Sequence, residues 1–229
     1  TLAYMAAVAE RDDRVRVLRW PHPFNYSAIN NFGAAHARGE VLALVNNDIE
    51  PTHGDWLTAM LRHALRPDIG CVGARLDYPD GRIQHGGVVL GIGGVAGHAH
   101  KFLAPQAPGY LDRLQLAHNA SAVTAACLVV RRAVFDAVGG LDESHLPVAF
   151  NDVDFCLRVE AAGYRNLWTP EAALIHHESV SRGGEDSPQK RTRAEAEARF
   201  MRERWGEQLD RDPAYNPNLT LAYEDFSLR

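Results

Sequence analysis

Several features are scarce or missing in this sequence. No stretch approaches the roughly 18 consecutive apolar residues of a membrane-spanning helix, and no signal-peptide pattern opens the chain. Charge of one sign is not in large excess: the formal net charge of −5 gives no electrostatic reason to expect nucleic acid or an acidic membrane as a partner. We therefore expect a cytoplasmic protein, with peripheral contact at the inner face of the membrane as the other possibility.

Cysteine is also scarce. The chain has only Cys71, Cys127 and Cys156, and each stands among apolar neighbours. Their odd number and their spacing fit no zinc-binding pattern. This favours buried, reduced thiols in a reducing compartment over disulfides or a structural metal site.

What the chain does contain is enough apolar sequence for a core, because 46% of its 229 residues are hydrophobic. Strand-like and helix-like patterns alternate without an internal repeat, which indicates an α/β fold, and we expect one domain over 1–229. Helical patterns cover 2–10, 26–39, 54–66, 132–140, 151–163 and, with many charges, 185–206. Strand patterns cover 14–20, 40–45, 69–76, 82–92, 122–132, 165–170 and 172–177.

The order of these patterns suggests two further expectations. The unbroken apolar run at 41–45 favours a parallel strand covered on both faces, while 91–110, rich in Gly, Pro and His, predicts a long loop. A parallel α/β fold usually opens with a hydrophobic strand, yet here the first clear strand comes at 14–20, after a helix. We therefore expect an N-terminal strand–helix–strand portion to be missing.

The first candidate site follows the strand at 40–45, where the chain continues as Asn46-Asn47-Asp48. In open parallel sheets, ligands bind beyond the carboxyl ends of the strands. A hard cation such as Mg²⁺ takes one or two protein carboxylates there and completes its shell with water and phosphate oxygens. A strand-to-loop turn, in which Asn and Asp form local hydrogen bonds, explains the same residues equally well.

The second candidate site is the start of the helix at 151–163. Asn151 or Asp152 can cap that helix, and Asp154 and Arg158, four residues apart, can form a surface ion pair. Asp152 shares a helix face with Phe155 and so points toward packed structure. A partly desolvated carboxylate at this position is a candidate general base.

The third candidate site is "LIHHESVSRGG". His176 and His177 end an apolar strand, and adjacent strand residues point to opposite faces, so one of them can reach a metal ion. Ser179, Ser181 and Arg182 follow with two glycines, a composition suited to a loop that contacts phosphate. A purely structural role for the histidines is the other interpretation.

Four segments together resemble a known enzyme family. "FNYSAINNFGAAHARGEVLALVNNDIEP", "GGLDE", "FNDVDFCLRVEAAGY" and "IHHESVSRG" look like family 2 inverting glycosyltransferases, and most like the rhamnosyltransferase-like enzymes of bacterial surface polysaccharide synthesis. Each motif alone is weak, but four in this order and spacing are specific. The resemblance runs from about Arg14 to Gly183.

This resemblance implies the GT-A fold, a mostly parallel, doubly wound α/β sheet that binds a nucleotide-diphospho-sugar donor and a saccharide or lipid-linked acceptor. The family's Asp-x-Asp motif corresponds to Asn46-Asn47-Asp48. Asp48 would then hold a divalent cation, Mg²⁺ or Mn²⁺, while Asn46 and Asn47 would face the donor. The family's Glu-Asp motif corresponds to Asn151-Asp152, so Asp152 would be the general base that deprotonates the acceptor hydroxyl.

The resemblance also implies roles on the donor side. His176 is the preferred further metal ligand, and His177 and Arg182 would contact the donor. Asn25 and Asn30 match a segment near the nucleotide pocket, although helix capping explains Asn25 equally well. The family's first strand, which carries the nucleotide base contacts, has no match in the chain.

On the acceptor side, the resemblance points to Asp142, Glu143 and Asp154, with turn capping as the other interpretation of the first two. His98 and His100 would share a face in an extended segment, which makes a zinc site conceivable, but no third ligand stands nearby.

Three other functions stay open at this point. The Asn residues at two acidic motif positions allow a non-catalytic module that binds a sugar nucleotide or glycan. A metal-dependent phosphohydrolase can use Asp48, Asp152 and a histidine, but no two-metal carboxylate cluster or phosphoacceptor motif is evident. The third is a nucleotide-binding oxidoreductase, because "GIGGVAG" nearly matches a dinucleotide-binding fingerprint at Gly91, Gly93 and Ala96, but no helix pattern follows it.

Overall fold

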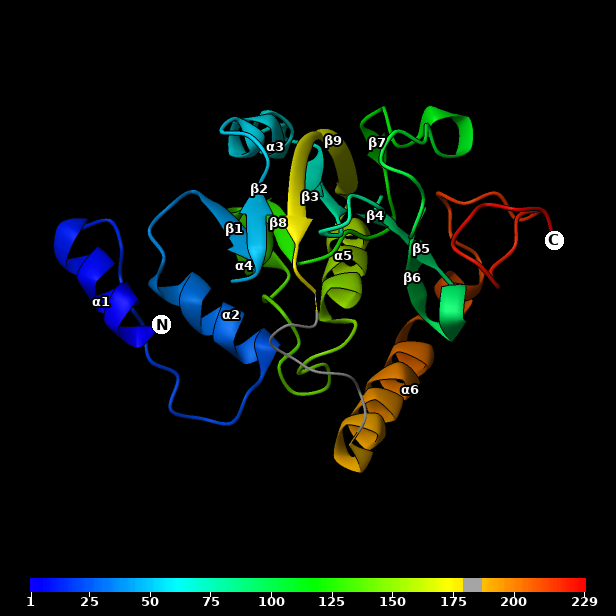
Figure 1. Cartoon of the computed structure of the whole chain (residues 1–229). Helices are drawn as coiled ribbons and strands as arrows, with labels where there is room; N and C mark the ends of the chain where they lie inside the picture. The colour runs from blue at the N-terminus through cyan, green and yellow to red at the C-terminus, as the bar shows by residue number, and fades with distance from the viewer. Residues whose placement is uncertain (179–186) are drawn as a thin grey trace.

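The computed structural model describes residues 1–178 and 187–229. Its centre is a sheet in the order β1-β8-β3-β9-β2, with β4 beside β3 and β7 beside β9 (Figure 1). A second, two-stranded sheet pairs β5 with β6. The strands are β1 (Val41–Val45), β2 (Ile49–Pro51), β3 (Ile69–Asp77), β4 (Ile83–His85), β5 (Val88–Leu90), β6 (Ala96–His98), β7 (His118–Asn119), β8 (Cys127–Arg131) and β9 (Arg165–His176).

Helices cover both faces of the central sheet. Alternate residues of β8 belong to different core clusters: Cys127 and Val129 pack with the α3 residue Met60, while Leu128 and Val130 pack with Phe155 of α5. α3 thus covers one face, and α5 the other (Figure 1). The helices are α1 (Leu2–Arg11), α2 (Tyr26–His36), α3 (Trp56–Ala64), α4 (Arg132–Ala137), α5 (Asn151–Ala161) and α6 (Pro188–Asp210), with 3₁₀ turns at Ile92–Gly94 and Tyr110–Asp112.

The α/β fold expected from the sequence is confirmed, but the expectation of a mostly parallel sheet is wrong for the described residues. Within them, β3 and β9 are the parallel pair, while β1 with β8, β8 with β3, and β2 with β9 are antiparallel. A run of apolar residues indicates that a strand is buried on both faces. It does not indicate whether the neighbouring strands are parallel or antiparallel to it. Even that burial is incomplete in β1, where Val45 is 43% exposed.

Two strand predictions are also wrong. Residues 14–20 form no strand, and no strand of the described chain pairs with them, because β-branched residues favour a strand only where a partner completes its hydrogen bonds. The pattern at 82–92 is broken at Gly86-Gly87, where Gly87 has a φ of 97°, so β4 and β5 belong to different sheets.

Three boundaries differ as well. The patterns at 165–170 and 172–177 form one strand, β9, whose register with β3 shifts between Thr169 and Ala173, where the sequence suggested a break. The strand predicted at 122–132 is shortened to β8. The predicted loop at 91–110 contains β6, which closes a hairpin with β5.

The helix α6 begins as its sequence suggests. Ser187 accepts a hydrogen bond from the N–H of Lys190, and Pro188 occupies the first turn, where its missing N–H costs nothing. Of its residues only Glu197, Met201 and Leu209 are buried, so most of this helix is a solvated, charged surface.

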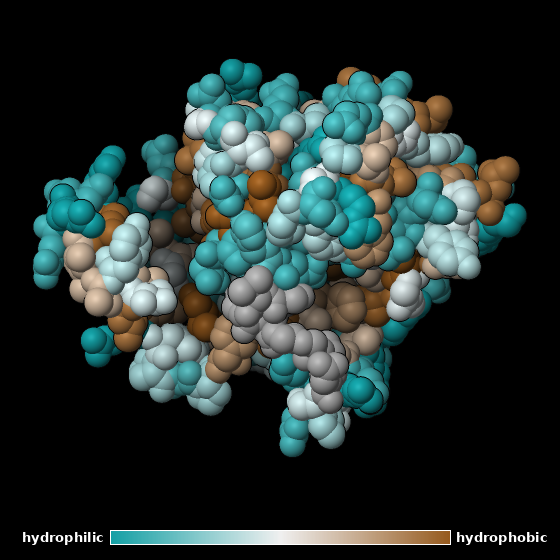
Figure 2. Space-filling model, in the orientation of Figure 1, coloured by the Kyte–Doolittle hydropathy of each residue, from teal (hydrophilic) through white to brown (hydrophobic). Residues whose placement is uncertain are grey.

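Two composition-based expectations can be compared with the structure. All three cysteines are buried and free of disulfides, as expected. No helix in 1–178 or 187–229 combines the length and the apolar character needed to cross a bilayer. Figure 2 shows a mainly hydrophilic face, with hydrophobic side chains visible in smaller groups among the hydrophilic ones.

Candidate active site

The turn after β1 and the end of β9 bring a carboxylate and an imidazole together. β2 sets Ile49 opposite His176 on β9, and the N–H of His177 donates to the carbonyl of Asp48 at 2.9 Å. Nε2 of His176 consequently lies 3.2 Å from Oδ1 of Asp48, and the two side chains are only 11% and 16% exposed. The two residues predicted as metal ligands are therefore neighbours.

Gln84 on β4 sets the orientation of His176. The amide nitrogen of Gln84 lies 3.1 Å from Oε2 of Glu178, to which it donates, so its Oε1 is the atom that lies 2.7 Å from Nδ1 of His176. Nδ1 of His176 then carries the hydrogen and donates it to Gln84. This leaves the lone pair of Nε2 directed at the carboxylate of Asp48.

Two electron-rich atoms at this distance repel each other unless a proton or a cation lies between them. An imidazole nitrogen and a carboxylate oxygen are suitable ligands for Mn²⁺, and 3.2 Å suits neighbouring ligands of an ion whose ligand bonds are about 2.1 Å. No group of three or more His, Cys, Asp or Glu residues converges on one point in the part of the chain that the structure describes. Asp48 and His176 thus fit a metal that draws its other ligands from water and phosphate oxygens.

Asp152 stands in the first turn of α5, where its carboxylate is held by the backbone. Oδ2 accepts a hydrogen bond from the N–H of Ala125 at 3.1 Å, and Oδ1 accepts one from the N–H of Val153 at 2.9 Å. Asn151 is buried and donates to the carbonyl of Val148, while the N-cap position belongs to Phe150. Helix capping therefore does not account for Asn151, and Asp152 keeps a fixed, partly exposed carboxylate.

These groups line one cleft of about 730 Å³. It brings together Asp152, the Asp48–His176 pair, Asn46 and Asn47, all expected from the sequence to belong to the site. The sequence analysis considered His98 only as a zinc ligand, and it missed other residues of this cleft, among them Tyr26, Gln84, Glu178, Lys190 and Arg193.

One signal for the missed residues is present in the sequence. Gln84-His85 is a polar pair inside an otherwise apolar strand pattern, followed directly by Gly86-Gly87, and both polar side chains are buried. Buried polar residues need partners, so such a pair points to a hydrogen-bonded site. Lys190 and Arg193 gave no comparable signal, because α6 is charged along most of its length.

Asn25 and Asn30, which were also proposed for the donor side, do not line this cleft. Asn25 caps α2 by accepting from the N–H of Ala28, and its own amide donates to the carbonyl of Glu143. Asn30 donates back to the carbonyl of Tyr26 within the helix. The structure therefore favours the capping interpretation for Asn25.

The two remaining donor-side residues follow β9. His177 points away from His176, as expected from strand alternation, and its Nε2 lies 3.0 Å from Oε2 of Glu50 on the exposed side of β2. Arg182 lies outside the described residues.

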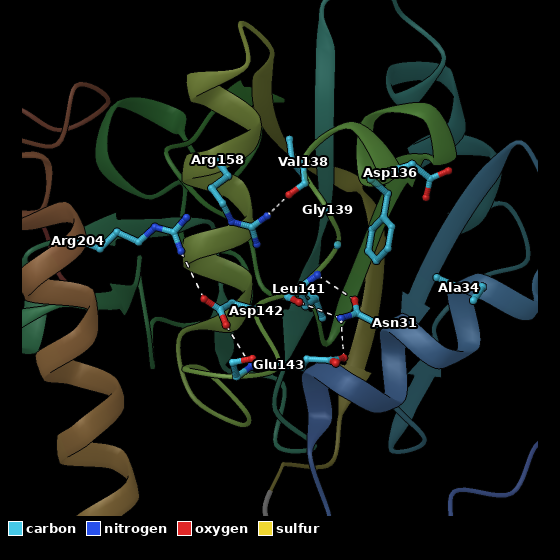
Figure 3. A pocket seen from close by; sticks show the side chains of 14 residues that line it. Asn31, Ala34, Asp136, Val138, Gly139, Leu141, Asp142, Glu143, Arg158 and Arg204 are labelled. Carbon is cyan, nitrogen blue, oxygen red and sulfur yellow. Dashed lines mark hydrogen bonds and ion pairs between the residues drawn. The ribbon is translucent and has the colours of Figure 1, made fainter.

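Asp142 and Glu143 line a different hollow, between α2, α4, α5 and α6, which Figure 3 shows from close by. The carboxylate of Asp142 accepts from the N–H groups of Ser144 and His145 and pairs with Arg204. Glu143 accepts from the amide of Asn31. Asp142 thus caps a turn, the second of the two roles that its sequence position allowed.

Asp154 does not reach the cleft. Its side chain is completely buried, with Oδ2 2.8 Å from Nε of Arg158 and Oδ1 accepting from the indole N–H of Trp205 at 2.9 Å. The expected pairing of Asp154 with Arg158 does form, but in the interior, and it ties α5 to α6. Nothing in these contacts supports the acceptor role suggested for Asp154.

His98 and His100 do not share a site. Nδ1 of His98 lies 2.7 Å from Nδ1 of His85, whereas Nε2 of His100 accepts from the N–H of Tyr110 and its ring stacks on Phe226. The zinc site considered from their spacing therefore does not form. "GIGGVAG" likewise connects β5 to β6 as a hairpin, so the dinucleotide fingerprint lacks its strand-to-helix turn.

Comparison with known proteins agrees with the resemblance found in the motifs. Residues 1–139 match the family described as glycosyl transferase family 2. The chain belongs to this family. It is 58% identical over its whole length to protein y4gI of Sinorhizobium fredii, and 41% identical over 95% of its length to the O-antigen biosynthesis protein RfbC of Myxococcus xanthus. It spans 25% of the first relative and 17% of the second.

Another relative carries a more specific name. The N-acetylglucosaminyl-diphospho-decaprenol L-rhamnosyltransferase of Mycobacterium tuberculosis is 30% identical over 61% of this chain and 48% of its own length. Among solved structures, the chain resembles the mannosyltransferase PcManGT of Pyrobaculum calidifontis, in complex with GDP-mannose and Mn²⁺. That match has a TM-score of 0.60 and 14% identity, over 95% of this chain and 53% of the other. The fold of this family 2 chain is thus that of the GT-A glycosyltransferases.

Proposed function

We propose that this family 2 domain transfers a sugar from a nucleotide-diphospho-sugar to a hydroxyl group of a saccharide or lipid-linked acceptor, with inversion at the anomeric carbon. The observation that carries the proposal is that Asp152 and the Asp48–His176 pair line the same cleft. A candidate base and a candidate cation site in one cleft are what displacement of a diphosphate by a hydroxyl requires.

Asp152 is the general base in this proposal. The N–H groups of Ala125 and Val153 each occupy one lone pair of its carboxylate and fix its orientation, which leaves other lone pairs to accept the proton of the acceptor hydroxyl. The deprotonated oxygen attacks the anomeric carbon from the face opposite the diphosphate, which inverts the configuration. Proton transfer by a positioned side chain contributes roughly 10²–10⁴ in rate.

Asp48 and His176 would hold a divalent cation, Mg²⁺ or Mn²⁺. When bound, such a cation neutralises charge that develops on the departing diphosphate. Gln84 keeps the imidazole of His176 in the tautomer and orientation that a metal ligand needs. Asn46 and Asn47 line the same cleft and would contact the donor.

The donor sugar in our proposal is L-rhamnose, and the acceptor is an intermediate of a surface polysaccharide. The support is the L-rhamnosyltransferase name of one relative and the O-antigen name of another. A lipid-linked acceptor would bring the protein to the inner face of the membrane as a peripheral protein.

A calorimetric titration of UDP, dTDP and GDP, each with and without Mn²⁺, tests the site on the full-length protein. We expect one nucleotide to bind in a Mn²⁺-dependent manner, and Asp48→Ala to abolish that binding. Asp55→Ala is the matched control, because Asp55 is exposed and makes no capping hydrogen bond at the start of α3. Incubation with dTDP-L-rhamnose and a short-chain GlcNAc-diphospho-lipid then tests transfer, and the anomeric configuration of the product, determined by NMR, tests inversion.

A second candidate function, a non-catalytic binding module, is favoured by Asn46 and Asn151 at acidic positions of the family motifs. Metal-dependent nucleotide binding without transfer to any tested acceptor would support it. Release of phosphate from nucleotides without sugar transfer would instead favour a phosphohydrolase.

A further inference from the structure

Two histidines from different sheets meet at the edge of the cleft. Nδ1 of His85, at the end of β4, lies 2.7 Å from Nδ1 of His98, at the end of β6, and the rings are nearly perpendicular, at 83°. His85 is completely buried, whereas His98 is partly exposed and lines the cleft. Neither residue has a role in the mechanism proposed above.

The hydrogen bonds around this His85–His98 pair define which nitrogen of each ring carries the hydrogen. The N–H of Thr124 donates to Nε2 of His85 at 3.4 Å, so Nε2 is an acceptor and the hydrogen of neutral His85 sits on Nδ1. That Nδ1–H donates to Nδ1 of His98, which must therefore be bare. The hydrogen of His98 is left on Nε2.

Burial keeps the pair uncharged. Desolvation lowers the pKa of His85 well below its usual value, and it also lowers the pKa of His98, although the charge of Asp152 opposes that shift. His98 is thus a neutral ring with a single hydrogen, on Nε2. Within 1–178 and 187–229, no hydrogen-bond partner is found for this Nε2–H.

The same short stretch of backbone positions the His85–His98 pair and the candidate base. The N–H of Thr124 holds His85, and the next N–H, of Ala125, holds the carboxylate of Asp152. His98 and Asp152 both line the cleft. The cleft therefore offers an N–H donor and a carboxylate acceptor. Saccharide hydroxyls can bind to both, because each hydroxyl donates and accepts hydrogen bonds.

Resting on the proposed function, we propose that His98 is a positioning residue that donates a hydrogen bond from Nε2 to a hydroxyl oxygen of the acceptor saccharide beside Asp152, and that His85 fixes the tautomer required. In this proposal the hydroxyl bound by His98 neighbours the hydroxyl that Asp152 deprotonates, so the acceptor forms hydrogen bonds through two adjacent oxygens. Because its Nδ1 already accepts from His85, His98 does not compete with Asp152 for the proton.

The tautomers are tested directly by NMR on full-length protein with ¹⁵N-labelled histidine. Long-range ¹H–¹⁵N correlations should show the hydrogen of His85 on Nδ1 and that of His98 on Nε2. Adding a soluble short-chain GlcNAc-diphospho-lipid should shift the Nε2–H resonance of His98. The opposite tautomer of either ring, or an unshifted His98 resonance, overturns the proposal whether or not transfer is observed.

Kinetics on dTDP-L-rhamnose and the same lipid separate positioning from folding. His98→Leu should raise the KM for the lipid and lower kcat/KM about 10- to 100-fold, while His98→Gln, whose amide nitrogen replaces Nε2–H, should recover most of the loss. His85→Leu should give a smaller loss and His85→Asn little, because the Asn amide can still donate to Nδ1 of His98. His53→Leu, at an exposed position outside the cleft, is the matched control.

Three outcomes distinguish the ways in which the proposal can fail. Unchanged kinetics in His98→Leu, with an active wild type, refute the role of His98 alone. A wild type that transfers no sugar and binds no nucleotide refutes the proposed function instead. If His98→Leu weakens Mn²⁺-dependent nucleotide binding and leaves the KM for the lipid unchanged, the oxygen that His98 contacts belongs to the donor, and the acceptor assignment is wrong.

Discussion

Nδ1 of His176 lies 2.7 Å from Oε1 of Gln84, and this contact, made within the sheet, determines which nitrogen of His176 faces Asp48. Residues that orient a metal-binding imidazole commonly change metal affinity 10–100-fold when they are replaced. We therefore expect Gln84→Leu to weaken Mn²⁺-dependent nucleotide binding about 10-fold or more, as measured by calorimetric titration. Gln115→Leu, at an exposed position outside the cleft, should bind like the wild type. Equal affinity in Gln84→Leu and wild type would show that Gln84 does not orient a ligand.

Replacement of Asp152 should separate catalysis from binding. Asp152→Asn keeps the side-chain shape and an oxygen for the N–H of Ala125, but it removes the basic carboxylate. We expect the transfer rate to fall by roughly 10²–10⁴, with nucleotide affinity unchanged. Single-turnover transfer and calorimetric titration measure the two quantities. Full transfer by Asp152→Asn would falsify the assignment of the base.

Asp154, two residues further along α5, should behave in the opposite way. Its carboxylate is completely buried between Arg158 and Trp205, so its loss leaves the mostly buried guanidinium of Arg158, whose side chain is 15% exposed, without this charge partner. Breaking such a pair typically costs about 3–5 kcal/mol. We expect Asp154→Asn to lower the free energy of unfolding in urea by an amount of this order, with transfer per folded molecule unchanged.

The matched control for this stability effect is Asp80→Asn, which breaks an exposed pair with Arg82. Solvent screens that pair, so the change in unfolding free energy should be far smaller than for Asp154→Asn. A comparable loss in both variants would argue against burial as the cause.

Glu197, a buried residue of α6, should stabilise a part of the backbone that lines the cleft. It is 1% exposed, and its Oε1 accepts from the N–H groups of Val148 and Ala149, which line the cleft. Glu197→Ala leaves both donors without this acceptor, and each hydrogen bond to a charged group contributes about 1.5–3 kcal/mol. We expect lower stability and faster amide hydrogen exchange at Val148 and Ala149. Amide exchange at wild-type rates in the variant would mean that Glu197 does not stabilise the backbone at Val148 and Ala149.

The sequence predicted the candidate site better than it predicted the sheet. Asp48 and Asp152 were identified because Asp48 follows a clear strand pattern and Asp152 stands near the start of a clear helix pattern. The positions of side chains at such ends can be predicted from the pattern. Strand alternation predicted that one of His176 and His177 faces the site, and the resemblance to the family selected His176. These inferences depend on local geometry, which neighbouring residues largely determine.

Other features depended on contacts between distant segments. The direction of β8 beside β1 is not encoded in the apolar run of either strand, because two-sided burial favours the same residues in parallel and antiparallel sheets. Asp154 and Asp152 stand in the same helical turn, and only the packing of α6 through Trp205 shows that Asp154 faces the interior. Gln84 was overlooked because its partner, His176, belongs to a strand far along the chain.

Buried histidine should make this protein less stable in mild acid. Burial lowers the pKa of His100 to about 3. Its Nε2 already accepts a hydrogen bond from the N–H of Tyr110, so protonation of Nε2 would place two hydrogens against each other. In the unfolded chain the pKa is about 6.5, so below that pH the unfolded state binds a proton that the folded state excludes. This contribution to stability is therefore complete above pH 6.5 and falls by up to about 1.4 kcal/mol per pH unit as the pH drops toward 3.

His100→Gln removes this titration and keeps an oxygen acceptor for the N–H of Tyr110. Urea unfolding between pH 7.5 and 5.5 should therefore show a smaller loss of unfolding free energy in the variant than in the wild type. The exposed His53→Gln should keep the wild-type slope, and an unchanged slope in His100→Gln would mean that other groups cause the acid sensitivity.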